Sequence, residues 1–367
     1  MKADEGTAAG GDSGDGVVDV GQQDIGRLLA PATARRQSMR GFDPEYADIV
    51  DYIIRCTHRI WEEKAVGLID THYRHNAVIH TPHGPVVGRE AVVAGTLQTL
   101  QAFPDRRLYG DAVVWSGDDV AGFYSSHRIT NTGTNAGPSA YGPATGRRCV
   151  WRGVADCVVL ENRIVEEWLI RDDMHLVRQL GFDPHAIARR LAEADRAKGI
   201  EPRDFGEVAR GRGQLPREPL PAPAPGDAEA LVAWHLEEVW NRRMLDRVGA
   251  FYDRGAVFHG PVGRKLHGAN EIAGFYLAVL AALPDAVFTV DHLCHVDETR
   301  IRRGATVAVR WTLQGTHDGP GLFGPASRGR VEVMGISHLR VVDGRVAEEW
   351  HLFDELAVLR QIALKTG

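Results

Sequence analysis

Apolar and polar positions follow two different periods along this chain, and the change from one period to the other occurs twice. Behind Pro44, apolar residues recur every three or four positions as far as Trp61, which predicts an amphipathic helix. Comparable stretches follow, bounded by the Pro, Gly and Asp residues that stop helices. The predicted helices are 44–61, a short segment ending near Tyr73 and 89–103 in the first half, and 227–241, a short segment ending near Tyr252 and 270–283 in the second half.

Strands are predicted after the third helix of each half. From Arg106 onward, runs rich in β-branched residues, such as VAGFYSSHRIT, RRCVWRGVADCVVL and RIVEEWLIRD, are bounded by Gly and Asp. Asp343 and Gly344 favour a type I′ turn between antiparallel strands. The order of the elements therefore predicts an α+β fold, in which helices cover one face of a strongly curved antiparallel sheet.

The chain repeats itself at an offset of 182 residues. Residues 133–180 align without a gap to 315–362, and 17 of these 48 positions are identical, where chance at ordinary composition gives about three. Upstream, the offset drifts to 180 at Pro104 and to 179 at Trp61, which indicates small differences in loop length. We therefore predict two tandem copies of one domain.

Two segments differ in composition from the repeats. Residues 1–40 are rich in Gly, Asp, Ala and Ser and poor in large apolar side chains, so we expect a disordered tail. Between the repeats, a helix is predicted for 184–198, followed by a Pro-rich stretch that favours an extended linker. The expected organisation is a tail (1–40), a first repeat (41–182), a helix and linker (183–226) and a second repeat (227–367).

Composition and charge exclude several classes of protein. With 43 Lys and Arg against 49 Asp and Glu, the net charge is −6, so we expect no nucleic-acid binding. No apolar stretch approaches the roughly 18 residues of a membrane span, so we expect no membrane contact. The four cysteines form no CxxC pair, which favours a reducing, cytoplasmic location. The sequence lacks nucleotide-binding motifs, and we expect no cofactor.

The second repeat carries the residues of a known family. Its block GTHDGPGLFGPASRGRVEVMGISHLRVVDGRVAEEWHLFDELAVLRQIA combines Gly-Thr-His, a Gly-Pro turn, an Asp-Gly hairpin, an acidic-acidic-Trp strand, an Asp and a closing helix. This pattern resembles the SnoaL-like polyketide cyclases of the nuclear transport factor 2-like superfamily, and the first repeat shows the same frame. The resemblance implies two cone-shaped α+β barrels. It also implies sheet-to-sheet pairing, so we expect an intramolecular pseudo-dimer of the two repeats, to which further copies can add.

The resemblance also implies an acid–base pair in the second repeat. In SnoaL-like cyclases, a His and an acid at about the separation of His317 and Glu332 act on the substrate. Whether Glu332 points into the cone depends on a strand register that the sequence leaves open. The first repeat has Asn135 and Val150 at these positions, and neither side chain transfers protons. If this pair matters, only the second repeat is competent.

Other ionisable positions occur in both repeats. Asp172 and Asp354 follow the shared Trp of each repeat, and they are either proton acceptors or caps of the closing helix. His80 and His259 are either structural or pocket donors, and His259 is the expected partner of a substrate carbonyl. The residues expected to line the substrate pockets are Trp350, Tyr252, Trp311, Trp168, Asp172 and His80.

A cluster of histidines raises the question of a metal. His72, His75, His80 and His83 lie within twelve residues. Zinc needs ligands that converge in space, and the second repeat keeps only the equivalent of His80, so we expect no metal site.

These features lead to one hypothesis and two alternatives. The hypothesis is a cofactor-independent lyase or isomerase, in which His317 with Glu332 or Asp354 removes a proton next to a carbonyl of a small hydrophobic, polyketide-like substrate. A noncatalytic module that binds a small molecule or serves in assembly fits the divergence of the first repeat equally well. Epoxide hydrolysis or dehydration is the third reaction class, with Asp354 and Arg310 as the available groups.

Overall fold

The structure is a computed structural model that describes residues 25–32, 34–201, 211, 215, 217–298 and 304–366. Residues 1–24 of the predicted tail, and part of the predicted linker, lie outside the described residues. Residues 25–40 differ from the expected disorder, because they form helix α1 (Ile25–Leu29) and bury Met39, which is 1% exposed. A few apolar side chains are enough here because the first repeat offers a helix surface on which they pack.

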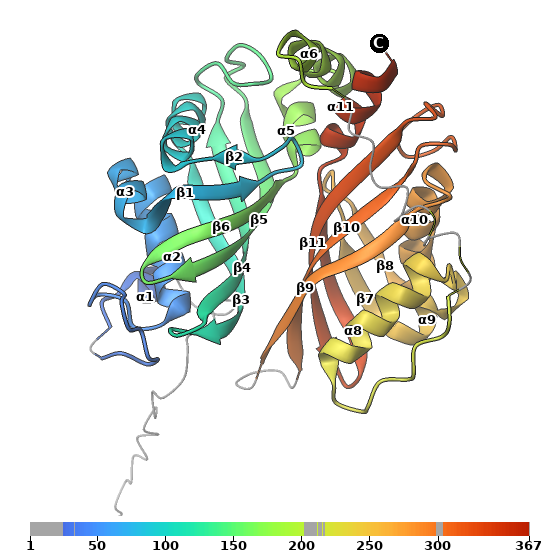
Figure 1. Cartoon of the computed structure of the whole chain (residues 1–367), viewed down its shortest axis with the longest axis horizontal. Coiled ribbons are helices and arrows are strands. Elements are labelled where there is room, and N and C mark those ends of the chain that lie inside the picture. The colour runs from blue at the N-terminus through green and yellow to red at the C-terminus, as the bar shows by residue number, and fades with distance from the viewer. Residues whose placement is uncertain are drawn as a thin grey trace, which may run out of the picture.

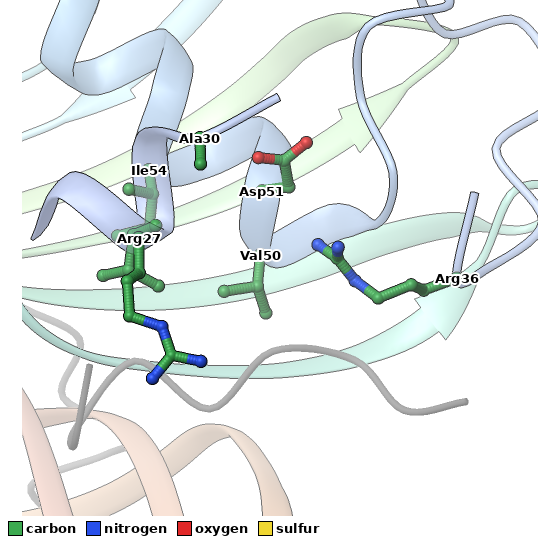
Figure 2. A pocket seen from close by; sticks show the side chains of 7 residues that line it. Arg27, Ala30, Arg36, Val50, Asp51 and Ile54 are labelled. Carbon is green, nitrogen blue, oxygen red and sulfur yellow. The ribbon is translucent and has the colours of Figure 1, made fainter. Parts of the chain in front are cut away.

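A pocket lies between α1 and helix α2 (Ile49–Trp61), as Figure 2 shows. Two of its three charged side chains have partners, because Arg36 pairs with Asp48 at 2.7 Å and Asp51 pairs with Arg55 at 2.7 Å. The lining residues are Arg27, Leu28, Ala30, Arg36, Val50, Asp51 and Ile54. All of them lie on or before α2, so the pocket is separate from the face of the sheet that carries the predicted chemistry.

The first repeat contains a six-stranded sheet in the order β2-β1-β6-β5-β4-β3. Strand β1 is parallel to β6, and the other strand pairs of this sheet are antiparallel. The Asp48 side chain starts α2 by accepting a hydrogen bond from the Asp51 backbone N–H at 2.7 Å. The remaining elements are a 3₁₀ turn (Val66–Leu68), α3 (Ile69–His72), β1 (Tyr73–His80), β2 (Val86–Val87), α4 (Arg89–Ala102), β3 (Arg107–Asp118), β4 (Gly122–Thr134), β5 (Arg148–Leu160), β6 (Arg163–Arg171), α5 (Asp173–Leu180) and α6 (Pro184–Ala197).

The second repeat has the same topology, with the strand order β8-β7-β12-β11-β10-β9. The predicted turn between its last two strands is confirmed, since Asp343 and Gly344 adopt φ values of 49° and 73°. None of the described helices is long and apolar enough to cross a membrane. The elements are α8 (Ala228–Leu236), a π-helical turn (Glu237–Asn241), a 3₁₀ turn (Leu245–Arg247), α9 (Val248–Phe251), β7 (Tyr252–His259), β8 (Lys265–His267), α10 (Gly268–Ala282), β9 (Val287–Asp297), β10 (Ala305–Thr316), β11 (Arg330–Val342), β12 (Arg345–Phe353) and α11 (Glu355–Thr366).

Each sheet has two faces, which we call inner and outer. The inner face carries the helices of its own repeat, and the outer face turns toward the other sheet (Figure 1). Alternate residues of β11 divide accordingly: Val331 and Val333 belong to the core under the helices, whereas Met334 and Ile336 pack toward the first repeat. The predicted α+β fold is confirmed, although the sheets stay open at their edge strands and do not close into barrels.

Apolar side chains and stacked cations join the two outer faces. Val154 and Ile170 of the first sheet form one cluster with residues of the second sheet. Beside them, the Arg310 guanidinium lies 3.4 Å from the ring centroid of Trp168. The equivalent Arg128 lies 3.7 Å from the ring centroid of Trp350, so the same cation–π contact is made twice, once in each direction.

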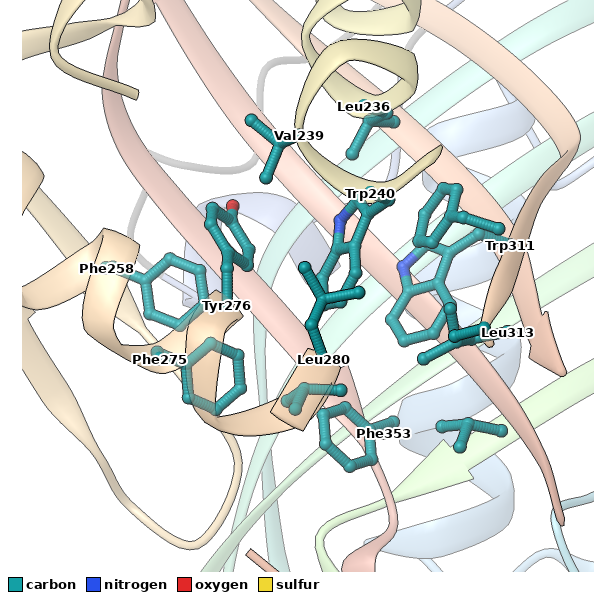
Figure 3. Close-up of a cluster of buried hydrophobic side chains, with 14 of the residues drawn as sticks. Leu236, Val239, Trp240, Phe258, Phe275, Tyr276, Leu280, Trp311, Leu313 and Phe353 are labelled. Carbon is teal, nitrogen blue, oxygen red and sulfur yellow. The ribbon is translucent and has the colours of Figure 1, made fainter. Parts of the chain in front are cut away.

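The inner faces differ in how densely they are filled. The second repeat has one large apolar cluster, in which aromatic rings interlock between the sheet and α10 (Figure 3). At four positions where the second repeat has an aromatic residue in this cluster, the first repeat has a smaller or polar one: Gly95, Thr96, Ile129 and Arg171. The aromatic residues they replace are Phe275, Tyr276, Trp311 and Phe353. The core of the first repeat is accordingly split into separate clusters.

Because the two cores are packed differently, we expect an added methyl group to destabilise the protein by different amounts at the equivalent glycines Gly335 and Gly153. A Cβ at Gly335 would lie 1.9 Å from Cζ2 of Trp311, whereas a Cβ at Gly153 would meet the Ile170 carbonyl oxygen at 3.3 Å. We expect G335A to lower the free energy of unfolding by about 2 kcal/mol and G153A by less than about 1 kcal/mol. Urea unfolding of the two variants measures the difference, and a larger loss for G153A would contradict the packing described above.

A charged bridge joins the two repeats at one end of the interface. His83, in the loop after β1, places Nε2 3.3 Å from Asp173 Oδ2 and 3.2 Å from Asp354 Oδ2, so it contacts a carboxylate of each repeat. Burial opposes the charged imidazolium, but the two carboxylates outweigh it and raise the pKa of His83 to about 9. Arg171 and Tyr141 also interact with Asp173.

The equivalent corner of the second repeat neutralises its carboxylates differently. There Arg264 pairs with Glu355, the equivalent of Asp173. The backbone N–H of Val262, the equivalent of His83, donates to Asp172 Oδ2 at 2.8 Å. Each corner therefore holds two carboxylates beside a side-chain cation, which is the Arg264 guanidinium in the second repeat and the His83 imidazolium, with Arg171 nearby, in the first.

The imidazolium bridge predicts a stability that depends on pH. Because the folded-state pKa of His83 is raised to about 9 from an ordinary value near 6.5, its stabilisation is complete below about pH 6.5 and is lost as the pH rises through 9. We expect H83Q to be less stable than the parent by about 2 kcal/mol at pH 6 and nearly equal to it at pH 10. Urea unfolding at both pH values tests this, with H75Q, at an exposed position, as the control. Equal effects at the two pH values would contradict it.

Candidate functional site

A hydrogen-bonded Tyr–Glu pair occupies the same place on the inner face of both sheets. In the first repeat, the Tyr73 hydroxyl at the start of β1 donates to Glu167 Oε2 on β6 at 2.9 Å. In the second repeat, Tyr252 on β7 donates to Glu349 on β12. Both glutamates are buried, at 7% and 0% exposure. A buried carboxyl group with a single fixed donor is suited to exchange a proton with a ligand.

In the second repeat, this pair belongs to a larger buried network. Glu349 Oε1 lies 3.1 Å from Nδ1 of His351, and the same Nδ1 lies 2.8 Å from the Ser337 hydroxyl. The Trp311 indole N–H donates to that hydroxyl at 3.0 Å. On the other side, the Tyr276 and Tyr252 hydroxyls are 2.6 Å apart. The carboxylate of Glu349 thus has partners on both of its oxygens.

Several nitrogens around this network have no hydrogen-bond partner among the described residues. They are both ring nitrogens of His235, Nε2 of His351 and Nε1 of Trp240. Burial lowers the pKa of His235 to about 4, so its ring is neutral at physiological pH. The second repeat therefore holds donors and acceptors that a polar molecule could use, but aromatic rings pack against them. His235 contacts Tyr252 and Tyr276, and His351 contacts Trp240 and Trp311.

The pair of the first repeat stands almost alone. Leu169 and Ala155 take the places of His351 and Ser337, so Glu167 keeps only its bond to Tyr73. Burial raises the pKa of Glu167 to about 7, against the lowering effects of the Tyr73 hydrogen bond and of the Arg171 charge. This carboxyl group is therefore poised to take up or release a proton near neutral pH.

Solvent reaches the inner face of the first repeat but not that of the second. The Arg171 side chain is 38% exposed, and Leu169 beside it is half-buried. Their equivalents in the second repeat, Phe353 and His351, are 2% and 1% exposed. The inner face of the first repeat is thus open to solvent at Leu169 and Arg171, beside the buried Glu167.

His317 lies in the turn after β10 and holds that turn together. Its backbone N–H donates to the Gly329 carbonyl at 2.9 Å, and its Nδ1 lies 3.1 Å from the Ser327 hydroxyl. Burial lowers the pKa of this histidine. Asn135 takes the same place in the first repeat, where its side-chain oxygen accepts from the Thr145 backbone N–H at 2.9 Å.

Glu332 points to the outer face of its sheet. It alternates along β11 with Val331 and Val333, which belong to the inner core, and it accepts a hydrogen bond from Gln314 at 2.6 Å. The structure therefore does not bring Glu332 and His317 together on one face.

His80 and His259 also face outward. His259 stacks on Trp350 with 5.3 Å between ring centroids and lies 2.9 Å from Glu348. His80 repeats this arrangement with Trp168 and Glu166, so both histidines and both tryptophans belong to the junction of the repeats.

Asp172 and Asp354 start the closing helices, as one of the two sequence interpretations had it. Asp172 accepts from the His175 backbone N–H at 3.3 Å, and Asp354 accepts from the Leu356 backbone N–H at 3.0 Å. Of the predicted lining residues, Trp311 and Tyr252 lie on the inner face beside Glu349.

The sequence reasoning missed Glu167 and Glu349. Both belong to the acidic-acidic-Trp motif, and both are retained across the duplication. The signal that could have found them is alternation along the strand, because a glutamate next to an outward Trp168 or Trp350 must face inward.

One group of described residues could hold a metal ion. His83, Asp173 and Asp354 place ligand atoms within 4.8 Å of one another. Arg171, with Nε 3.7 Å from Asp173, supplies positive charge at the same place, so a proton on His83 satisfies the carboxylates without a metal. His72 and His80 do not join this group, because they contact Tyr46 and Glu166 instead.

Comparisons with known proteins agree with this architecture. The SnoaL-like polyketide cyclase family matches residues 52–180 and 230–362, more than half of the chain. Comparison with curated proteins gives no match.

Solved structures match one repeat at a time. A putative SnoaL-like polyketide cyclase from Jannaschia sp. CCS1 is 20% identical over 39% of this chain and 98% of its own, with a TM-score of 0.33. AclR, a putative hydroxylase from Streptomyces galilaeus, is 23% identical over 35% of this chain and 92% of its own, with a TM-score of 0.31. IdmH, a putative polyketide cyclase from Streptomyces antibioticus, is 24% identical over 34% and 96%, with a TM-score of 0.30. The chain belongs to the SnoaL-like polyketide cyclase family, whose domain it carries in two tandem copies.

Proposed function

We propose that the first repeat is a cofactor-independent acid–base catalyst that removes a proton next to a carbonyl of a small hydrophobic, polyketide-like molecule. The observation that carries this proposal is Glu167: a carboxyl group with a pKa of about 7, held by Tyr73, on an inner face that solvent reaches. A general base works best when its pKa lies near the operating pH.

In this reaction, Glu167 takes the proton and the carbon–hydrogen electron pair moves toward the carbonyl oxygen. The resulting enolate either attacks a second carbonyl of the same molecule, which closes a ring and leaves an alkoxide, or is protonated at another carbon, which isomerises the molecule. In both cases the proton held by Glu167 is returned, to the alkoxide or to that carbon, and the base is regenerated. Tyr73 acts as a positioning residue, because its hydroxyl fixes Glu167 Oε2 and leaves Oε1 for the substrate.

The second repeat has a supporting role in this proposal. Its outer face covers that of the first repeat through the Arg310–Trp168 and Arg128–Trp350 contacts, and we propose that this packing is an intramolecular form of the sheet-to-sheet pairing expected for the family. The alternative, a binding module without catalysis, draws support from the filled inner face of the second repeat.

Matched variants of the two glutamates test the assignment. The probe is 2-tetralone in deuterium oxide, an apolar ketone whose exchange next to the carbonyl is followed by mass spectrometry. We expect E167Q to lose at least about 100-fold in exchange rate, because an amide cannot accept the proton, and E349Q to keep the parent rate. The rate of the parent protein should rise with pH through about 7, the pKa of Glu167.

Circular dichroism of both variants confirms that they are folded. If E349Q loses exchange while E167Q keeps it, the reactive carboxyl lies in the second repeat. If the parent protein does not accelerate exchange above the rate in buffer, the binding alternative replaces the catalytic one.

A further inference from the structure

The Arg106 guanidinium is half-buried on the inner face of the first repeat, and its residue lies in the turn between α4 and β3. Its Nε and Nη2 donate to Asn131 Oδ1 at 3.1 and 2.6 Å. Its guanidinium carbon lies 4.0 Å from the ring centroid of Trp61 and 5.8 Å from that of Trp151. The side chain is therefore fixed by one neutral amide and two indoles, and it presents Nη1 without a hydrogen-bond partner among the described residues.

The charge of this arginine is poorly compensated. Burial, together with the positive charge of Arg171, lowers the pKa of Arg106 to about 9. The nearest acid that interacts with it, Glu62, is engaged elsewhere: it pairs with Arg107 at 3.0 Å and accepts from the Leu108 backbone N–H at 2.7 Å. Among the described residues, no carboxylate lies within ion-pair distance of Arg106. Its Nη1 is open to solvent, so an anionic ligand can reach the guanidinium and supply the missing negative charge.

The fold does not need this cation. The second repeat has the same strands and helices, yet Ala286 stands where the first repeat has Arg106. Leu313 likewise stands in place of Asn131, and Phe353 in place of Arg171. The three polar residues are thus specific to the first repeat, the one whose inner face solvent reaches. Because the second repeat folds without them, we infer that they serve ligand binding and not folding.

Arg171 adds a second positive charge on the same inner face, on the strand that carries Glu167. It lies four residues beyond Glu167 on β6, so both side chains are on the inner face with about 13 Å between their backbone positions. Asp173 compensates part of its charge at 3.7 Å, which leaves Arg106 as the stronger anion donor of the two.

We propose that the inner face of the first repeat binds a hydrophobic molecule that carries a carboxylate, with the carboxylate on Arg106 Nη1 and an aromatic part of the molecule near Trp61. Arg171 adds long-range attraction. The proposal rests on the function proposed above and deepens it, because the carboxylate would hold the molecule on the same inner face that carries Glu167.

Two probes of equal shape and different charge test this. Naphthalene-2-carboxylate and naphthalene-2-carboxamide are titrated into the full-length protein at pH 7.5 by isothermal titration calorimetry. We expect the carboxylate to bind at least about 10-fold more tightly than the amide, and R106Q to remove that preference. R107Q, which changes the neighbouring exposed arginine, should leave both affinities unchanged.

The variants also separate this proposal from the catalytic one. If E167Q loses deuterium exchange while R106Q keeps the carboxylate preference, the anion site is wrong and the catalytic proposal stands. If R106Q loses the preference while E167Q keeps exchange, the anion site stands and Glu167 is not the base. Equal affinities of the two probes for the parent protein, or no binding of the carboxylate at millimolar concentration, would overturn the anion site even if R106Q failed to fold.

Discussion

Packing of the two sheets through their outer faces is the constraint on which the rest of this structure depends. A sheet with one face in solvent alternates apolar and polar residues, but here Val154, Ile170, Ile336 and Leu352 make the outer faces apolar where they meet. The outer faces meet through apolar side chains and through Arg128 and Arg310, each stacked on a tryptophan of the other repeat. Because an arginine on an indole keeps its stem packed and its head partly hydrated, it can cross an interface that an isolated charge could not.

With the outer faces fixed in this way, the inner faces were free to diverge. The second repeat fills its inner face with aromatic rings and closes a hydrogen-bond network around Glu349. The first repeat replaces Phe275 by Gly95 and Tyr276 by Thr96, and loses the packing that these rings supply. Such replacements are expensive in stability when nothing else fills the space. One copy thus retains a dense core, while the other holds a buried carboxyl group whose pKa burial raises to about 7.

The two repeats also differ in where they place charged side chains. At the two ends of the interface, paired carboxylates are neutralised by Arg264 in one repeat and by His83 in the other. Inside the first repeat, Arg106 and Arg171 surround an accessible surface, and their equivalents in the second repeat are apolar. The duplication therefore produced two copies of one backbone with different interiors: aromatic side chains fill one copy, and we propose that the other binds a ligand.

The sequence by itself determined the fold class, the duplication and most helices and strands, because periodicity and turn residues act locally. It also identified Asp172 and Asp354 as possible helix caps, which depends only on neighbouring residues. Tertiary structure alone decided which residues form a site. Glu332 faces outward because of the strand register, His317 is used within a turn, and the open inner face belongs to the first repeat, where the sum of many substitutions across distant elements leaves Glu167 within reach. The space left inside a repeat and the direction of each side chain depend on packing between elements that are far apart in the chain. A local sequence pattern therefore does not predict them.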